Sequence, residues 1–441
     1  MTDEGSTSVS KAVLEIAERY STNDPNLTTS SYVKDLLSKF KEDDGKEDAM
    51  KVLSTLFPED ETTRLSFGTA GLRAEMQPGP LGMNDFTVVQ TAQGLAKYCL
   101  QQYKEKRRAA GVVTPENPSK KMKTTGDSGT AAVPSLRAVV GYDHRAQPDY
   151  DLTSSKFAIL TKLVFESVGV ECEVLDGYIF TPLVPYTLQK LNAVVGIMIT
   201  ASHNPKQDAG YKVYSFDGCQ IRSPTDQHIS AYIEDNLIPW KNYAEDIESK
   251  KKSLPDINGD DLKDPCSKLG YTNPELTKEM LSSYYDSITH SGLRITRVTS
   301  SSSPTSTKLP PPPKICYTAM HGVGYPYATR VFEEFNLQPF ISVKEQQDPD
   351  PTFPTVPFPN PEEKGALDIA KAYAEKEGCN IVLANDPDAD RLAVAEFDPT
   401  TKEWTVFHGD QIGAMLGLWI WEQVGKKSNK VRCALGGQYS F

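Results

Sequence analysis

The feature that most constrains the fold of this 441-residue chain is a repeated alternation of short apolar runs with amphipathic segments. In residues 136–200, "LRAVVGYDHR" and "VECEVLD" have the pattern of strands, "SSKFAILTKLVFESVG" that of a helix, and "NAVVGIMIT" that of a buried strand. Residues 314–398 repeat the pattern, from "KICYTAM" through "ALDIAKAYAEKEG" to "NIVLAN" and "LAVAEFD". Strand and helix alternating at this spacing predict α/β domains with mainly parallel or mixed sheets.

The predicted domain organisation has four parts. Residues 1–57 are polar and helical in pattern. Residues 58–240 and residues 241–407 are predicted to form one α/β domain each. Residues 408–441 begin a third unit, with the helix "GDQIGAMLGLWIWEQV" and the strand "KVRCAL". Within the first α/β domain, "RLSFGTAGLRAEMQPGP" is dense in Gly and Pro and is predicted to be a loop. Residues 107–135 and 296–313 are low in apolar content and are predicted to be surface insertions, the first of them mobile.

Composition excludes some classes of partner. A net charge of -12 and a pI near 5.2 argue against nucleic acid or an anionic membrane, but not against a phosphorylated substrate held in a local basic pocket. The N-terminus lacks a basic stretch followed by an apolar one, and "IGAMLGLWIWEQV" is shorter than the ~20 apolar residues of a membrane helix. Seven scattered cysteines without CxxC spacing predict reduced thiols, no zinc site and a cytoplasmic protein.

The sharpest chemical signal is "LANDPDADRLAV". Asp386, Asp388 and Asp390 alternate between two apolar runs, and alternate residues of an extended loop point the same way. Carboxylates this close repel each other by several kcal/mol per pair, which a hard divalent cation such as Mg²⁺ or Ca²⁺ relieves. An acidic surface turn is the plain alternative. An EF-hand is excluded, because its required glycine and glutamate positions hold Arg391 and Phe397.

A second signal is Ser202, in "GIMITASHNPKQDAGYK". The serine follows a buried strand, and α/β sheets bind ligands beyond the carboxyl ends of their strands. A turn serine that bonds its own backbone is the plain alternative. A serine hydrolase would need a G-x-S-x-G elbow and a nucleotide-binding P-loop would need GxxxxGK[ST], and the sequence contains neither motif.

Three cations strengthen the second signal. Arg73 ends "SFGTAGLR" after small residues that let a guanidinium approach an anion, Arg391 follows the aspartates, and Lys212 follows the serine. Together with the hydroxyl and the carboxylates they make a set suited to phosphoryl transfer. His144 in "GYDHR" and His321 in "MHGVGY" follow predicted strands and are expected to be structural.

These stretches resemble the α-D-phosphohexomutase superfamily, and within it the eukaryotic phosphopentomutase branch with its glucose 1,6-bisphosphate synthase relative. The resemblance rests on "FGTAGLR", "ASHNPKQDAGYKVY", "HGVGY", "DPDPTFPTVPFPNPEEKG" and "LANDPDADRLAVAE", and spans about residues 67–417. It implies tandem three-layer α/β/α domains with mixed sheets. Residues 58–240 would be domain I with the phosphoserine, and residues 241–407 domain II with the metal loop.

The resemblance also implies a mechanism. Ser202 would carry a phosphoryl group, and its phosphate would hold Mg²⁺ together with the three aspartates. Lys212 would be the general acid/base, while other residues would contact the phosphoserine or the sugar: His203, Asn204, Arg73 and Arg391. A phosphosugar would exchange its phosphoryl group between C1 and C6, or C1 and C5, through a bisphosphate that also serves as activator.

The family has four domains, so the third is expected to be only begun here and the fourth to be missing. Their sugar-binding and phosphate-gripping loops would then be absent. A catalytically inactive truncated fragment and a glucose 1,6-bisphosphate synthase-like phosphotransferase are therefore alternatives to a mutase. In each case a monomer is expected, with a phosphorylated sugar as partner and with neither nucleic acid nor membrane.

Overall fold

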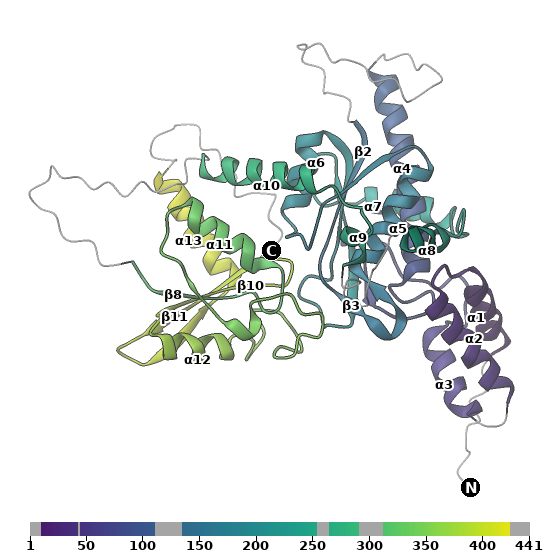
Figure 1. The fold of residues 1–441 in the computed structure, drawn as a ribbon, viewed down its shortest axis with the longest axis horizontal. Helices are drawn as coiled ribbons and strands as arrows, with labels where there is room; N and C mark the ends of the chain where they lie inside the picture. Colours follow the sequence, from purple (N-terminus) through teal and green to yellow (C-terminus); the bar gives the residue numbers. More distant parts are fainter. Residues whose placement is uncertain (1–9, 43–44, 111–134, 254–263, 291–311, 424–441) are drawn as a thin grey trace, which may run out of the picture. The chain divides into compact units, whose positions relative to one another are not determined.

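The chain folds into two units in the computed structural model of this protein, each built around its own five-stranded sheet. The structure describes residues 10–42, 45–110, 135–253, 264–290 and 312–423 (Figure 1). The first unit takes most of the chain up to Pro274, and the second takes Glu275 onward. Two short segments, Ile179–Leu183 and Ser202–Lys206, belong to the second unit. The second segment carries the predicted nucleophile.

The first unit begins with a three-helix bundle: α1 (Lys11–Asn23), α2 (Leu27–Lys41) and α3 (Lys46–Leu56). Apolar residues at three- and four-residue spacing give each helix one buried face, and these faces share a core. Tyr20 lies at its centre, with its ring 5.5 Å from that of Phe57 and 5.3 Å from that of Phe86. Asn26 caps α2 and donates its side-chain amide to the Tyr150 carbonyl at 3.0 Å, which ties the bundle to the following α/β domain.

The first sheet has the strand order β1-β7-β6-β2-β5. Its strands are β1 (Leu72–Glu75), β2 (Ser135–Tyr142), β5 (Glu171–Val174), β6 (Ala193–Ile199) and β7 (Asp208–Ser215). The pairs β1–β7 and β7–β6 are antiparallel, whereas β6–β2 and β2–β5 are parallel. The sheet is therefore mixed, as predicted.

Helices cover both faces of this sheet, because its central strands are apolar on both sides. Val195, Ile197 and Ile199 of β6 share the core that includes residues of α4 (Asp85–Ala109), α5 (Ser154–Ser167) and α7 (Thr225–Glu234). Gly196 of β6 points the other way, toward α6 (Leu183–Leu191). The shorter elements of the unit are β3 (Ala146–Gln147), η1 (Pro148–Tyr150), β4 (Leu152–Thr153), α8 (Tyr243–Ser253) and α9 (Pro265–Lys268).

The second sheet has the strand order β12-β11-β10-β8-β9. Its strands are β8 (Ile315–Thr318), β9 (Ile341–Ser342), β10 (Ile381–Asn385), β11 (Leu392–Asp398) and β12 (Glu403–Phe407). The helical elements of this unit are α10 (Pro274–Thr289), α11 (Gly324–Glu334), η3 (Lys344–Gln346), α12 (Asp368–Glu377) and α13 (Gly409–Gln423). In Figure 1, α12 lies on one side of the sheet and α11 and α13 on the other.

The two sheets pair their strands in the same way. In the second, β12–β11 and β11–β10 are antiparallel, and β10–β8 and β8–β9 are parallel. Strand β10 thus corresponds to β6, and β11 to β7. The loop between β6 and β7, which contains Ser202, and the loop between β10 and β11, which contains Asp386–Asp390, consequently occupy equivalent places in the two sheets.

The sequence predicted most of the long elements but missed several others. The glycine-rich stretch predicted to be a loop contains β1, and β7, β12, α6, α7 and α8 were not predicted. Helix α4 extends to Ala109, so the predicted insertion at residues 107–135 starts too early. Most of that insertion, most of the one at residues 296–313 and the predicted strand "KVRCAL" lie outside the described residues.

The cysteines and the helix lengths of the described residues were also the subject of predictions. Their six cysteines are free thiols, five of them buried. Among the described helices none combines the length and the apolar character that a membrane crossing requires. Helix α13 nevertheless exposes a row of large apolar side chains: Met415, Leu416, Leu418, Ile420 and Trp421.

Candidate active site

Ser202 lies in the loop that follows β6, and the backbone of this loop is strained. The φ angle of Ser202 is 52°, in the left-handed region that residues other than glycine rarely adopt. The side chain is 3% exposed, and its Oγ donates a hydrogen bond to Asp386 Oδ2 at 2.9 Å. The ring of His203 places Nδ1 3.4 Å from the same Oγ. The serine hydroxyl is therefore bonded to the aspartate loop, 184 residues further along the chain.

The aspartates lie in the loop between β10 and β11. One carboxylate oxygen from each of Asp386, Asp388 and Asp390 lies within 4.8 Å of the others, so the three side chains converge as predicted. Asp386 and Asp388 are fully buried, whereas Asp390 is exposed. The turn is tight because Ala389 takes a left-handed φ of 53° and donates its N–H to the Asp386 carbonyl at 2.9 Å.

Arg391 joins the serine to the carboxylates. Its backbone N–H donates to Asp386 Oδ1 and its Nε to Asp386 Oδ2, both at 3.0 Å. Its Nη2 lies 3.0 Å from Asp386 Oδ2 and 3.4 Å from Ser202 Oγ. The guanidinium therefore lies where it can contact an anion carried by the serine.

Asp388 has a partner that the sequence did not reveal. Thr181 donates its hydroxyl to Asp388 Oδ2 at 2.6 Å and its backbone N–H to the Asp388 carbonyl at 2.9 Å. Thr181 precedes the aspartate by 207 residues, and nothing in its neighbourhood of the sequence marks it as a partner of an acidic loop. It fixes the middle carboxylate from outside the hairpin.

The electrostatics of the loop favour a bound cation. Burial raises the pKa of Asp386 well above its usual value, and the charges of Asp388 and Asp390 raise it further, while Arg391 opposes the shift. Three carboxylates that repel one another in a largely buried setting form an oxygen-only donor set of the kind Mg²⁺ and Ca²⁺ prefer. The residues present therefore fit a divalent metal.

The other predicted site residues are placed differently. Asn204 lies in the serine segment and is partly buried. Arg73 on β1 and Lys212 on β7 belong to the first unit, so their approach to Ser202 stays a prediction. The register pairs Arg73 with Gly210, which puts Arg73 and Lys212 on one face of the first sheet. Lys212 is 7% exposed.

The two histidines given a structural role make packing contacts. His144 is buried, and its ring lies edge-on to Tyr178 at 6.0 Å. His321 is buried as well, and its Nε2 lies 2.8 Å from Thr355 Oγ1. These contacts are consistent with the structural role expected from the sequence.

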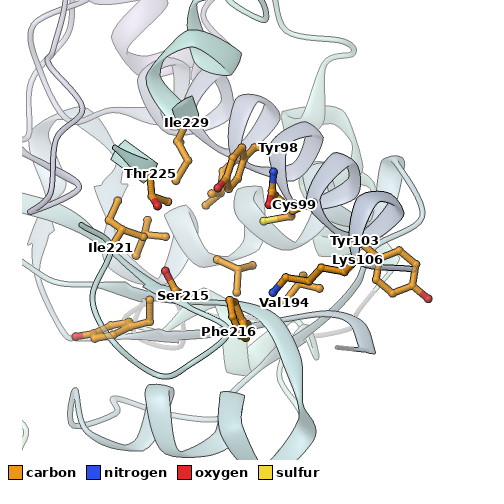
Figure 2. A pocket seen from close by; sticks show the side chains of 15 residues that line it. Tyr98, Cys99, Tyr103, Lys106, Val194, Ser215, Phe216, Ile221, Thr225 and Ile229 are labelled. Carbon is orange, nitrogen blue, oxygen red and sulfur yellow. The ribbon is translucent and has the colours of Figure 1, made fainter. Parts of the chain in front are cut away.

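A cavity of about 200 Å³ in the first unit is unrelated to these residues. It lies between α4, α7 and the strands β6 and β7, where Tyr98, Cys99, Val194, Phe216 and Ile229 line it (Figure 2). Its walls contain none of the predicted site residues. The residues that the sequence predicted for a site therefore lie outside this cavity.

Comparison with known proteins agrees with the fold. Residues 107–237 match the alpha/beta/alpha domain I of phosphoglucomutase/phosphomannomutase, and residues 282–398 match domain II. Together these matches cover more than half of the chain. The protein belongs to the phosphoglucomutase/phosphomannomutase family, that is, to the α-D-phosphohexomutase superfamily, and its mixed α/β sheets are those of that family.

Its relatives indicate the branch of the family. The phosphopentomutase of Homo sapiens is 39% identical over 377 residues, which are 85% of this chain and 52% of that protein. The glucose 1,6-bisphosphate synthase of Homo sapiens is 36% identical over 383 residues, 84% of this chain and 50% of that protein. The chain thus spans about half the length of the relatives it matches.

A solved structure supports the fold. The phosphoglucomutase/phosphomannomutase family protein of Burkholderia thailandensis superposes with a TM-score of 0.52 at 17% identity. The match covers 83% of this chain and 60% of that protein. At this level of identity the likeness concerns the fold alone.

Proposed function

We propose that this chain is the phosphoserine- and metal-bearing part of a phosphosugar mutase. The observation that carries the proposal is the 2.9 Å hydrogen bond from Ser202 Oγ to Asp386, the first of three convergent carboxylates. A phosphoryl group on Oγ would add roughly two negative charges beside these carboxylates. Such an arrangement requires cations, and Arg391 together with Mg²⁺ held by Asp386, Asp388 and Asp390 would supply them.

The proposed reaction is a balanced exchange. A hydroxyl of the bound sugar phosphate attacks the phosphorus of phosphorylated Ser202 and loses its proton to Lys212 Nζ. The P–Oγ bond breaks, Oγ recovers the proton, and the sugar leaves as a bisphosphate or turns over in the site. In the second transfer, Ser202 Oγ attacks the other phosphorus of the bisphosphate and gives up its proton. The bond from that phosphorus to the sugar oxygen breaks, and the sugar oxygen takes the proton. Bound Mg²⁺ would neutralise charge on the phosphoryl oxygens during each transfer.

Other residues of the chain have positioning roles in this proposal. His203, which lies 3.4 Å from Ser202 Oγ, and Arg391 would orient the phosphoserine. Arg73 and Asn204 would contact the phosphoserine or the sugar. The phosphopentomutase relative favours conversion of a pentose 1-phosphate to its 5-phosphate, and glucose 1-phosphate is the second candidate substrate.

A glucose 1,6-bisphosphate synthase-like phosphotransferase is the alternative, because a relative of that name is similar to the same part of the chain. Such an enzyme would use the same phosphoserine but release the bisphosphate. An inactive fragment is the third outcome, because the chain spans only half the length of its relatives.

Phosphorylation of Ser202 tests the proposal directly. The purified chain, first treated with phosphatase, is incubated with Mg²⁺ and glucose 1,6-bisphosphate, and its intact mass is measured. We expect one phosphoryl adduct of about 80 Da that maps to Ser202 and disappears in Ser202→Ala. Absence of the adduct would refute the phosphoserine role.

Turnover then distinguishes the alternatives. The same protein is assayed with ribose 1-phosphate and glucose 1-phosphate, each with a trace of sugar bisphosphate. Conversion to the 5- or 6-phosphate supports a mutase, and net formation of bisphosphate from a phosphoryl donor supports a synthase. Phosphorylation without either product identifies a fragment that accepts the phosphoryl group but cannot deliver it.

A further inference from the structure

The turn after β8, His321–Gly324, packs directly against the backbone of the aspartate loop. Val323 donates its N–H to the Pro387 carbonyl at 2.8 Å. A Cβ built on Gly322 would lie 2.3 Å from Pro387 Cα and 2.5 Å from its carbonyl oxygen, so only glycine permits this approach. Pro387 lies between two predicted metal ligands, so the turn packs against the backbone that carries them.

A chain of two hydrogen bonds closes the base of the same loop. The Tyr317 hydroxyl at the end of β8 donates to Asn385 Oδ1 at 2.9 Å, and Asn385 Nδ2 donates to the Arg391 carbonyl at 2.6 Å. Asn385 is the residue before the first aspartate, and Arg391 the residue after the last. A Cβ on Gly324 would lie 2.4 Å from the Tyr317 hydroxyl, so this glycine leaves room for the phenol.

The turn is held in place from its other side as well. Met320 and His321 both have left-handed φ angles, 51° and 61°, a conformation that costs of order 1–3 kcal/mol per residue unless the surroundings impose it. The surroundings include Gln346, whose carbonyl accepts from His321 N–H at 2.9 Å, and Thr355, which lies 2.8 Å from the His321 ring. Strain that surrounding hydrogen bonds maintain indicates that the conformation of this turn is required.

The first unit repeats the arrangement at the serine loop. There the turn after β2 supplies Asp143, whose N–H donates to the Ile199 carbonyl at 3.0 Å, and Arg145, whose Nη1 donates to the Asp208 carbonyl at 3.0 Å. Ile199 ends β6 and Asp208 begins β7, so both ends of the serine loop are tied. In both sheets the turn after the neighbouring parallel strand anchors the loop that carries the chemistry.

We propose that Tyr317, acting through Asn385 and together with the His321–Gly324 turn, is a positioning residue that sets the metal affinity of the Asp386–Asp390 loop. The Tyr317 hydroxyl donates to Asn385, which is not a predicted ligand. It fixes the two residues that flank the loop and so preserves the spacing of the three carboxylates. The inference rests on the proposed function only in requiring that this loop bind a divalent cation.

The test is Mn²⁺ binding by the full chain, measured by electron paramagnetic resonance of the free ion and independent of activity. Tyr317→Phe removes one hydroxyl and keeps the ring. Removal of partners that orient metal ligands typically weakens binding by 10- to 100-fold, and we expect about tenfold here. Tyr325→Phe, which removes a hydroxyl from the adjoining helix α11, is the matched control and should bind as the unaltered chain does.

A double-mutant cycle separates positioning from general destabilisation. Asn385→Ala should weaken Mn²⁺ binding by a similar factor, and combining it with Tyr317→Phe should weaken it no further, because both act through one connection. Tyr317→Phe with unchanged Mn²⁺ affinity would overturn the positioning role and leave the proposed function standing. Independent, multiplicative losses would likewise overturn it. Failure of the unaltered chain to bind Mn²⁺ would overturn the metal site itself.

Discussion

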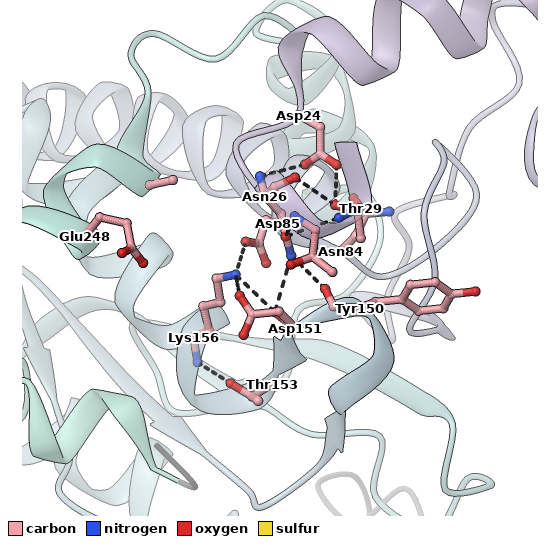
Figure 3. A network of polar contacts seen from close by, with 12 residues as sticks. Asp24, Asn26, Thr29, Asn84, Asp85, Tyr150, Asp151, Thr153, Lys156 and Glu248 are labelled. Atoms are coloured by element: carbon pink, nitrogen blue, oxygen red, sulfur yellow. Dashed lines mark hydrogen bonds and ion pairs between the residues drawn. The ribbon is translucent and has the colours of Figure 1, made fainter. Parts of the chain in front are cut away.

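Asp24 should make the N-terminal bundle less stable as pH rises. The carboxylate is buried at the end of α1, where Asn26 N–H donates to Oδ1 at 3.0 Å and the Thr29 hydroxyl donates to Oδ2 (Figure 3). No lysine or arginine pairs with it among the ion pairs of the described residues, and Asp85 at the start of α4 adds a like charge. Burial raises its pKa to about 7, and repulsion from Asp85 contributes, although the hydrogen bonds from Thr29 and Asn26 oppose the shift.

The sign and size follow from linkage. The ordinary pKa of the group is 3.8, so between that value and about 7 the folded chain binds a proton that the unfolded chain has lost. The free energy of unfolding therefore falls as pH rises through this window. A difference of about three pKa units corresponds to roughly 4 kcal/mol, fully expressed above the folded-state pKa.

Asp24→Asn removes the titration while keeping the shape. The variant loses one hydrogen-bond acceptor, which costs about 1 kcal/mol at acid pH. Near pH 8 it should be more stable than the unaltered chain by roughly 3 kcal/mol, because its neutral amide avoids the cost of a buried charge. The unaltered chain loses about 1 kcal/mol by about pH 4.5, so the two stability curves should cross there and separate further up to pH 8.

The assay is native-state hydrogen exchange of the α1 and α2 amides, followed by mass spectrometry from about pH 4 to pH 8. After correction for intrinsic exchange rates, it measures the free energy of local unfolding. Asp35→Asn is the control, because Asp35 is an exposed carboxylate on α2 that pairs with Lys39 at the surface. Its curve should parallel that of the unaltered chain. Parallel curves for Asp24→Asn as well would refute the reasoning.

Three further predictions concern the sheet and the exposed helix. Arg145→Met should destabilise the first unit by about 3–5 kcal/mol in urea unfolding, because the buried Asp143 carboxylate then loses the guanidinium that lies 3.5 Å away. Adding Asp143→Asn to the same chain should restore part of this loss. Gly71→Ala should lower the free energy of unfolding by more than about 2 kcal/mol, since φ is +76° and the added Cβ would lie 1.9 Å from the Tyr211 carbonyl oxygen. Gly68→Ala is the control: its Cβ would meet no atom within 4 Å, so its stability should be nearly unchanged. Replacing the two exposed leucines of α13 by lysine should lower self-association in light scattering, and unchanged scattering would show that this apolar row is not responsible.

The sequence predicted the chemical groups of the candidate site better than the residues that hold those groups in place. Convergence of Asp386, Asp388 and Asp390 followed from period-two spacing between two strands, which is a local property. Thr181 and Tyr317 were missed because their partners are distant in the chain and the contact depends on tertiary packing. Strand β1 was missed because its flanking glycines and prolines have the composition of a loop, and only pairing with β7 makes it a strand.

The equivalence of the two hairpin loops is hidden in the sequence for a related reason. Strand pairing and core packing tolerate many apolar substitutions, so two sheets with the same topology need share no motif. The loops differ because one presents a hydroxyl and the other three carboxylates. What they share is strain at a residue other than glycine, with a φ of 52° at Ser202 and 53° at Ala389. A residue that costs stability in this way persists where its geometry is required, and Ser202 and Ala389 lie in the two loops that meet at the Ser202–Asp386 hydrogen bond.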